Sequence, residues 1–127
     1  MKVSAGAEFI ITNFFYDNRF YFEFCARCRA AGIAVPILPG ITPITSVKLM
    51  TSLAETCGAS IPEEVRAGLA RIAEGDAAAL AAFGVELALR QARELLQRGA
   101  PGIHVCTMDR SSAAAAIVRQ LRSEGLL

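Results

Sequence analysis

The sequence predicts an α/β fold in which short parallel strands alternate with helices. Three apolar runs end in polar or turn-forming residues: FIIT before Asn13, VPIL before Pro39 and Gly40, and IHVC before Thr107 to Arg110. Each run is followed by a helical pattern, and strands that alternate with helices pair in parallel through crossovers. The carboxyl ends of parallel strands share the edge at which ligands bind. We therefore expect a functional site where these three runs end.

The first strand and helix have clear boundaries. The strand is predicted over Phe9 to Asn13 and the helix over Asn18 to Ala31. Asp17 is expected to cap this helix, because a carboxylate can accept from the free N–H groups of a first turn. Gly32 then ends it.

The second strand, Val35 to Leu38, contains Pro36, which is awkward in a central strand because it cannot donate to the ladder. Thr42 is expected to cap the next helix, with Pro43 at the first position, where the missing N–H costs nothing. The apolar stripe of this helix, which Gly58 ends, is predicted to be Ile44, Val47, Met50, Leu53, Ala54 and Cys57.

Two further helices precede the last strand. Ser60 to Glu63 has the spacing of a capping box and predicts the start of a short helix. Asp76 is expected to start a longer, alanine-rich helix that ends near Gly99.

The predicted sheet is too narrow to be complete. Its last strand covers Ile103 to Thr107, and Ser111 or Ser112 is expected to cap the closing helix. Three apolar parallel strands leave both edges open, whereas such strands need cover on both faces and partners at both edges. We therefore expect residues 1–127 to form a single segment of a larger β/α barrel.

Composition and charge argue against several classes of function. The 127 residues carry a net charge of +1, and the 13 basic residues form no stripe, so no nucleic-acid partner is expected. The most apolar stretch, Ala77 to Leu89, is too short and too charged to span a membrane. With no leader pattern before the first strand, a cytoplasmic location is expected. The four irregularly spaced cysteines predict reduced thiols.

An ordered set of short motifs runs along almost the whole chain. Residues 2–17 read KVSAGAEFIITNFFYD, followed by RCRAAGI at 27–33 and VPILPGI at 35–41 with Pro43. Further along come IP at 61–62, GVE at 84–86 and PGIH at 101–104, then Thr107 and Arg110. In order and spacing this set resembles the methylenetetrahydrofolate reductase family, whose first run is KVxAGAxFxITQxFFD.

This resemblance implies a fold, a reaction and cofactors. The family has a (β/α)8 TIM barrel, of which the present chain resembles about the last three βα units. The family uses FAD, with NADH or NADPH as reductant, to convert 5,10-methylenetetrahydrofolate to 5-methyltetrahydrofolate in one-carbon and methionine metabolism. Its acidic residue that protonates the folate, and most of its flavin contacts, belong to earlier strands. The resemblance therefore implies no catalytic residue here and no activity for the isolated chain.

Two positions match family contacts to folate. Asn13 stands where the family has a pterin-binding glutamine, and its shorter amide still offers a donor and an acceptor. Arg110 matches an arginine near the glutamate tail of the folate, where a guanidinium can hold a carboxylate with two hydrogen bonds. Asp109 replaces an asparagine beside it and would compete for Arg110.

Three other positions match family contacts less well. Leu49 occupies the place of a folate-contacting glutamine, and Leu53 that of a phenylalanine that stacks on the substrate. Leucine cannot donate a hydrogen bond and stacks less well than a ring, so packing in the helix core or interior is the better explanation of both residues. Lys2 matches a lysine that contacts the flavin. No metal site is expected.

Other residues whose side chains could carry out chemistry are better explained as structural residues. His104, the only histidine, is expected to be an interior residue of the last strand. Cys25 and Cys28 have CxxC spacing, but they fall inside a predicted helix, whereas redox pairs lie at a helix start after a strand. Zinc would need two more ligands, and none shows paired spacing. The aromatic residues between Phe9 and Phe24 are expected to pack into the core.

Three hypotheses follow. In the first, the chain is the C-terminal part of a methylenetetrahydrofolate reductase-like flavoenzyme and supplies part of its folate-binding rim through Asn13 and Arg110. In the second, it is a non-catalytic split subunit or remnant whose open edges pair with an N-terminal half-barrel or with another copy. The third is an unrelated β/α ligand-binding module.

Overall fold

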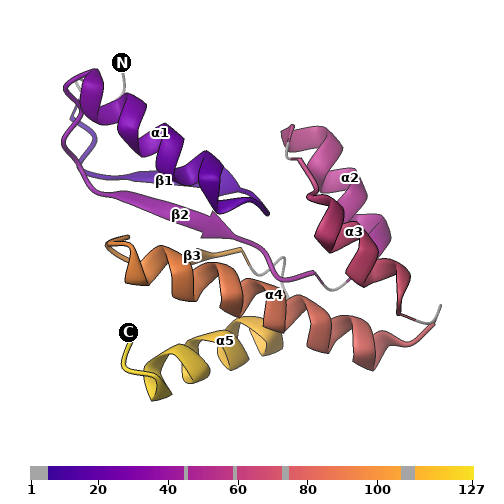
Figure 1. The fold of residues 1–127 in the computed structure, drawn as a ribbon. Coiled ribbons are helices and arrows are strands. Elements are labelled where there is room, and N and C mark those ends of the chain that lie inside the picture. Colours follow the sequence, from indigo (N-terminus) through magenta and orange to yellow (C-terminus); the bar gives the residue numbers. More distant parts are fainter. Residues whose placement is uncertain (1–5, 45, 59, 73–74, 107–110) are drawn as a thin grey trace.

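A three-stranded parallel sheet lies at the centre of the molecule (Figure 1). The computed structural model describes residues 6–44, 46–58, 60–72, 75–106 and 111–127. Strand β1 (Ile10–Phe14) pairs with β2 (Ile37–Ile41), which pairs with β3 (His104–Val105). The order is β1-β2-β3 and both pairings are parallel, which confirms the predicted α/β fold with crossover connections.

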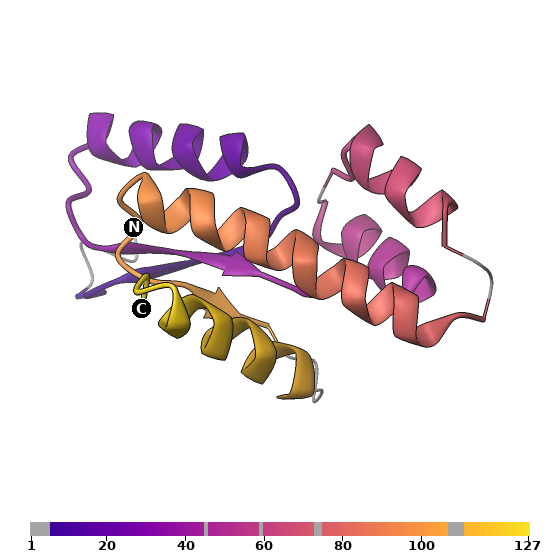
Figure 2. The same cartoon turned by 60° about the horizontal axis from the view of Figure 1, so that its bottom comes forward.

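The helices fall into two groups. α1 (Asn18–Ala30), α4 (Ala77–Gln97) and α5 (Ser111–Ser123) lie side by side, with α4 in the middle and in contact with both neighbours (Figures 1 and 2). α2 (Val47–Cys57) and α3 (Glu63–Ala70) lie beyond the carboxyl end of β2 (Figure 1). No helix within the described residues is long and apolar enough to cross a membrane.

Two apolar clusters hold these elements together. The larger cluster joins the sheet to α1, α4 and α5, and its most buried members, at most 1% exposed, include Ile37, Ile41, Leu95, Ile117 and Leu121. Fully burying side chains of this size contributes about 1.5–3 kcal/mol each. The smaller cluster joins α2, α3 and α4 to the end of β1; its buried members are Phe14, Tyr16, Ile44, Met50, Val65 and Leu87.

The second strand differs from its prediction. Pro36 precedes β2, and its carbonyl accepts a hydrogen bond from the Ile10 N–H at 2.9 Å. Pro39 and Gly40, predicted to follow the strand, lie inside it. The strand begins later because Ile37 and Ile41, with exposures of 1% and 0%, both belong to the core.

The start of α2 was also predicted wrongly. Its N-cap is Ser46, whose Oγ accepts from the Leu49 N–H at 3.2 Å, so neither Thr42 nor Pro43 begins the helix. Thr42, Pro43 and Ile44 are instead buried in the connection between β2 and α2. Of the predicted stripe, Met50 and Ala54 are buried, Val47 is 45% exposed and Ile44 precedes the helix; the side chains of Leu53 and Cys57 lie outside the described part.

The predicted cap of α3 is also wrong, and of the two caps predicted for α5 Ser112 is excluded. The N-cap of α3 is Pro62, which has no side-chain acceptor, so Ser60 forms no capping box. α5 begins at Ser111, which places Ser112 inside the helix. By contrast, Asp76 caps α4 as predicted, accepting from the Ala79 N–H at 3.0 Å.

Asp17 caps α1 as predicted, and it makes the stability of this helix depend on pH. Its Oδ1 accepts from the Arg19 N–H at 3.0 Å, and its Oδ2 lies 2.7 Å from the Arg19 guanidinium. The hydrogen bond from the Arg19 side chain is the main cause that lowers the pKa of this carboxyl, against a smaller opposing effect of burial. A lowered folded-state pKa stabilises the protein above the unfolded pKa, and this stabilisation is lost as the pH falls through the lowered value.

We expect Asp17→Ala to lower the free energy of unfolding by about 1 kcal/mol at neutral pH, the usual cost of losing an N-cap. The difference from the unmodified chain should shrink in acid, because protonation already weakens the Asp17–Arg19 pair. Urea unfolding at several pH values measures this difference in the free energy of unfolding. Asp17→Asn is the matched control, since it keeps a capping oxygen without the titratable group. A cost for Asp17→Ala that stays constant down to strongly acidic pH would contradict the assignment.

Candidate functional site

Asn13 lies near the carboxyl end of β1, with its side chain exposed. It borders a cavity of about 490 Å³ lined by β1, by α1 and by the segment that follows α2. The α1 contribution is aromatic, from Phe20, Tyr21 and Phe24. The site therefore combines one neutral amide with apolar and aromatic walls, as expected for the binding of a flat, hydrogen-bonding ligand.

A bulge in the sheet sets the position of Asn13. The register between β1 and β2 shifts between Ile11 and Phe14, where β2 carries Pro39. Proline has no N–H to give to a ladder, and a bulge is the usual way for a strand to absorb such a missing bond. The Thr12 hydroxyl accepts from the Gly40 N–H at 3.0 Å and donates to the Asn13 carbonyl at 2.9 Å. One threonine side chain thus bridges the two strands beside Asn13.

The structure describes only part of the predicted site. Leu49 lies in the first turn of α2 and is 38% exposed, but it is not among the residues lining the cavity beside Asn13. Lys2 and Arg110, like Asp109, lie outside the described residues, as does the side chain of Leu53. The structure therefore places Asn13 at the carboxyl edge of the sheet and does not join Leu49 to it.

Thr42 is a residue that the sequence reasoning treated as a helix cap. It directly follows β2 and is 7% exposed, and its Oγ1 has no hydrogen-bond partner among the described residues. Buried hydroxyls almost always have a partner. Its position straight after the VPILPGI motif at 35–41 was the signal that could have identified it.

His104 and the cysteines carry little chemistry in this arrangement. His104 is exposed, so the prediction of an interior residue was wrong; its Nδ1 lies 3.6 Å from the Cys106 sulfur. The exposure arises because β3 covers only His104 and Val105 and forms an edge of the sheet. Cys25 and Cys28 lie inside α1 as free thiols, as predicted. No cluster of three metal-binding side chains occurs within the described ranges.

The aromatic residues near the N-terminus divide between core and surface, where core packing alone had been expected. Tyr16 and Tyr21 are 5% exposed, and the Tyr21 hydroxyl donates to the Ile37 carbonyl at 2.7 Å. Phe9, Phe20 and Phe24 are 54%, 46% and 38% exposed. Phe20 and Phe24 belong to α1 and Phe9 immediately precedes β1, at the edge of the sheet that the described residues leave without a neighbouring strand.

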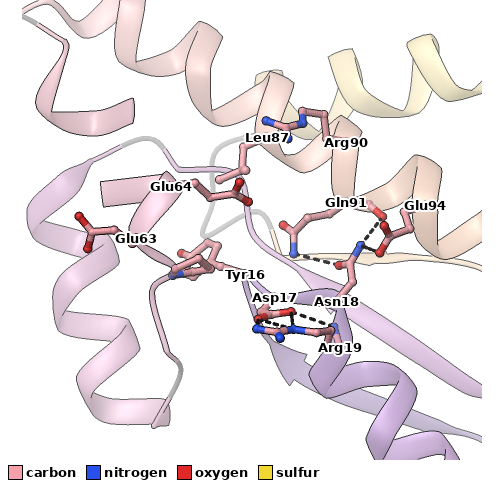
Figure 3. A pocket seen from close by; sticks show the side chains of 11 residues that line it. Tyr16, Asp17, Asn18, Arg19, Glu63, Glu64, Leu87, Arg90, Gln91 and Glu94 are labelled. Atoms are coloured by element: carbon pink, nitrogen blue, oxygen red, sulfur yellow. Dashed lines mark hydrogen bonds and ion pairs between the residues drawn. The ribbon is translucent and has the colours of Figure 1, made fainter. Parts of the chain in front are cut away.

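A second cavity of about 430 Å³ lies between the start of α1, the start of α3 and the middle of α4 (Figure 3). Gln91 on α4 is 6% exposed, and its Nε2 donates to the Phe15 carbonyl at 2.9 Å. Asn18 donates to the Glu94 carboxylate at 2.9 Å. The sequence reasoning missed Gln91; its spacing of four residues from Leu87 and Leu95, both buried, could have marked it as an interior polar residue.

Tyr16 also lines this second cavity. Burial of its hydroxyl raises the pKa of Tyr16 to about 12. The phenol is therefore neutral throughout the physiological range and can act there only through hydrogen bonding.

Comparison with known proteins identifies similar sequences. Residues 1–122 match the family described as methylenetetrahydrofolate reductase. The chain is 36% identical over 120 residues to "Methylenetetrahydrofolate reductase (NADH) 1" of Arabidopsis thaliana, covering 94% of this chain and 20% of that protein. It is 34% identical over 123 residues to "5,10-methylenetetrahydrofolate reductase" of Escherichia coli, covering 94% of this chain and 40% of that protein. The chain thus spans two fifths or less of the length of these relatives.

Proposed function

Because the chain belongs to the methylenetetrahydrofolate reductase family, we propose that it supplies part of the folate-binding rim of a flavin-dependent reductase. The complete enzyme would be cytoplasmic and would reduce 5,10-methylenetetrahydrofolate to 5-methyltetrahydrofolate with NADH or NADPH. The observation that carries the proposal is the family match over residues 1–122, in which Asn13 is exposed at the carboxyl edge of the sheet. The match also removes the reading as an unrelated β/α module.

In this proposal Asn13 binds the pterin. Its carboxamide can donate and accept at once, as the edge of a pterin requires. The Thr12 hydroxyl bridges β1 and β2 beside Asn13, and aromatic residues of α1 line the same cavity. Arg110 would hold the glutamate tail of the folate, with Leu49 and Leu53 as apolar contacts and Lys2 at the flavin.

Neither described cavity suits a flavin dinucleotide. The residues lining the cavity beside Asn13 include no lysine or arginine that could bind a diphosphate. The lining of the second cavity carries four carboxylates and two arginines, and this excess of negative charge would repel a diphosphate. In our proposal FAD is therefore held outside the described part of the chain, by further βα units of a (β/α)8 barrel, and no catalytic group is assigned here.

Complementation tests this proposal. The chain alone is expected to bind no stoichiometric flavin and to oxidise no NAD(P)H in the presence of methylenetetrahydrofolate. Adding the separately expressed remainder of the barrel of the Escherichia coli relative is expected to restore both flavin absorbance and activity, and Asn13→Ala in the restored complex should raise the KM for folate about tenfold or more. Gln97→Ala, which removes an exposed amide of α4 that lines neither cavity, is the matched control and should leave the KM for folate unchanged.

Two results would overturn it. One is turnover with bound flavin by the chain alone, which would show that the site is complete. The other is a stable complex, confirmed by size-exclusion chromatography, that binds flavin but shows no folate-dependent activity. Because activity is judged only after the complex has been observed, a failure of the two parts to assemble is not mistaken for a failure of the assigned function.

A second candidate is a non-catalytic subunit that docks onto a partner half-barrel or onto another copy. The apolar surface of the cavity beside Asn13 favours such a docking subunit. It includes Ile11, Phe20 and Phe24, which are 43%, 46% and 38% exposed and lie at the β1 edge of the sheet. Exposed apolar clusters of this kind mark interaction surfaces, and an unpaired strand edge is a template for pairing. Size-exclusion chromatography over a wide concentration range should show association; a chain that stays monomeric alone and with the half-barrel would exclude this candidate.

A further inference from the structure

The second cavity, between α1, α3 and α4, contains a buried acceptor with no donor. Gln91 is 6% exposed, and its Oε1 is buried without a hydrogen-bond partner among the described residues. In Figure 3 this oxygen faces the cavity, on the side of Tyr16 and Glu64. Leaving a buried acceptor unsatisfied destabilises the folded state, so a donor that enters the cavity would be bound favourably.

The orientation of the Gln91 amide is set by its other contact. Its Nε2 lies 2.9 Å from the Phe15 carbonyl and 3.3 Å from Asn18 Oδ1. Since a carbonyl oxygen can only accept, the NH₂ group must point there and Oε1 must point toward the cavity. A flipped amide would bring two acceptors together and leave the NH₂ group without either partner.

The N–H donors of Asn18 and Arg19, beside the cavity, bind to acceptors of the protein itself. Asn18 Nδ2 donates to the Gln91 carbonyl at 3.2 Å and to Glu94 Oε1 at 2.9 Å. Arg19 is paired with Asp17 at 2.7 Å. Neither Asn18 nor Arg19 therefore donates to Gln91 Oε1, and a ligand that carries N–H groups of its own would satisfy that oxygen.

Charge and shape define that ligand further. Glu63, Glu64 and Glu94 line the cavity with Arg90, which leaves an excess of negative charge after the Asp17–Arg19 pair is set aside. The Glu64 carboxylate points toward the cavity, whereas Glu63 points away (Figure 3). The remaining lining includes the apolar surfaces of Tyr16, Pro62 and Leu87, and the volume of about 430 Å³ suits a small molecule.

We propose that this cavity binds a small aliphatic amine. The ammonium group would donate to Gln91 Oε1 and pair with the Glu64 carboxylate, while its methylene groups would lie on Tyr16, Pro62 and Leu87. The site is independent of the folate-binding proposal, because Asn13 does not line this cavity.

Titration of the chain with n-butylammonium, followed by NMR, tests the proposal. The side-chain amide signals of Gln91 and Asn18 are expected to shift to saturation. Tetramethylammonium, with the same charge and no N–H, and n-butanol, with no charge, should bind at least about fivefold more weakly, which is close to 1 kcal/mol. Glu64→Gln should also weaken the binding of n-butylammonium by at least about fivefold. The matched control Glu63→Gln should change the Kd for n-butylammonium by less than about twofold.

Both glutamates are exposed, so neither variant is expected to disturb folding; unchanged amide spectra in the absence of ligand verify this. The proposal is overturned if no saturable shift occurs up to about 100 mM amine. It is also overturned if tetramethylammonium binds as tightly as n-butylammonium, or if Glu64→Gln and Glu63→Gln have equal effects.

Discussion

Gly84→Ala is expected to lower the free energy of unfolding by about 3 kcal/mol, at the upper end of the usual cost of overpacking. A Cβ at this position would clash with the Ile44 carbonyl oxygen and would lie under 3.0 Å from the Ile44 carbonyl carbon and backbone nitrogen. These are backbone atoms of the buried connection between β2 and α2, so no side-chain rotation can relieve the clash. α4 would have to move away from the sheet, at the cost of contacts in both apolar clusters.

Gly68→Ala is the matched control for Gly84→Ala. Its Cβ would lie 2.5 Å from the ring of Phe83, a side chain that can turn away. Alanine also favours a helix over glycine by about 1 kcal/mol, which offsets the repacking. Urea unfolding of the two variants should therefore separate them by about 2 kcal/mol; equal stabilities would mean that α4 does not approach the Ile44 backbone this closely.

Gly40→Ala is expected to have the next largest effect, a loss of about 2–3 kcal/mol. Its Cβ would lie 2.5 Å from the Thr12 carbonyl oxygen, on the neighbouring strand. The Gly40 N–H also donates to the Thr12 hydroxyl at 3.0 Å, so separating the strands would break that bond as well. Because Thr12 bridges to Asn13, the variant should displace the candidate folate-binding residue together with the strand.

Gly102→Ala is the matched control for Gly40→Ala. Its Cβ would meet the Leu38 Cδ2 at 3.2 Å, at the end of a side chain that can adjust. Its cost should stay within about 1 kcal/mol. Thermal unfolding measures both variants, and amide NMR shifts at Thr12 and Asn13 should accompany the loss of stability in Gly40→Ala alone. A Gly40→Ala variant with native stability and native shifts would contradict the tight approach of β1 and β2.

The sequence predicted the elements better than it predicted their ends. Three strands and five helices appear among the described residues in the predicted order, because each has its own apolar period. The caps at Asp17 and Asp76 were predicted correctly, since both caps depend on local hydrogen bonds to the first helical turn. The predicted cap at Thr42 failed because burial of the connection decides that boundary.

The energies of burial and of capping explain why burial of the connection sets the start of α2. Ile44 is 2% exposed, and burying such a side chain contributes about 1.5–3 kcal/mol, whereas an N-cap contributes about 1 kcal/mol. Moving the helix start to Ser46 retains both contributions, because Ser46 supplies the cap and Ile44 stays in the core. The sequence pattern alone carries no information about which connection packs against α4.

Of the two candidate sites, one could be found from the sequence and the other only from the structure. Asn13 could be found from the sequence, because it ends an apolar run and stands within a family motif. The cavity around Gln91 could not, because its lining comes from residues 16–19, 62–64 and 87–94, which only the packing of α1 and α3 on α4 brings together.

The amino-acid sequence by itself determined the alternation of strands and helices and the family, since both depend on local periodicity and on the order of short motifs. Only the tertiary structure decided where Pro39 and Gly40 lie, which aromatic rings are exposed, and which polar atoms face a cavity. The physical reason is that close packing and hydrogen-bond satisfaction depend on groups far apart in the chain, whose mutual distances no local pattern specifies.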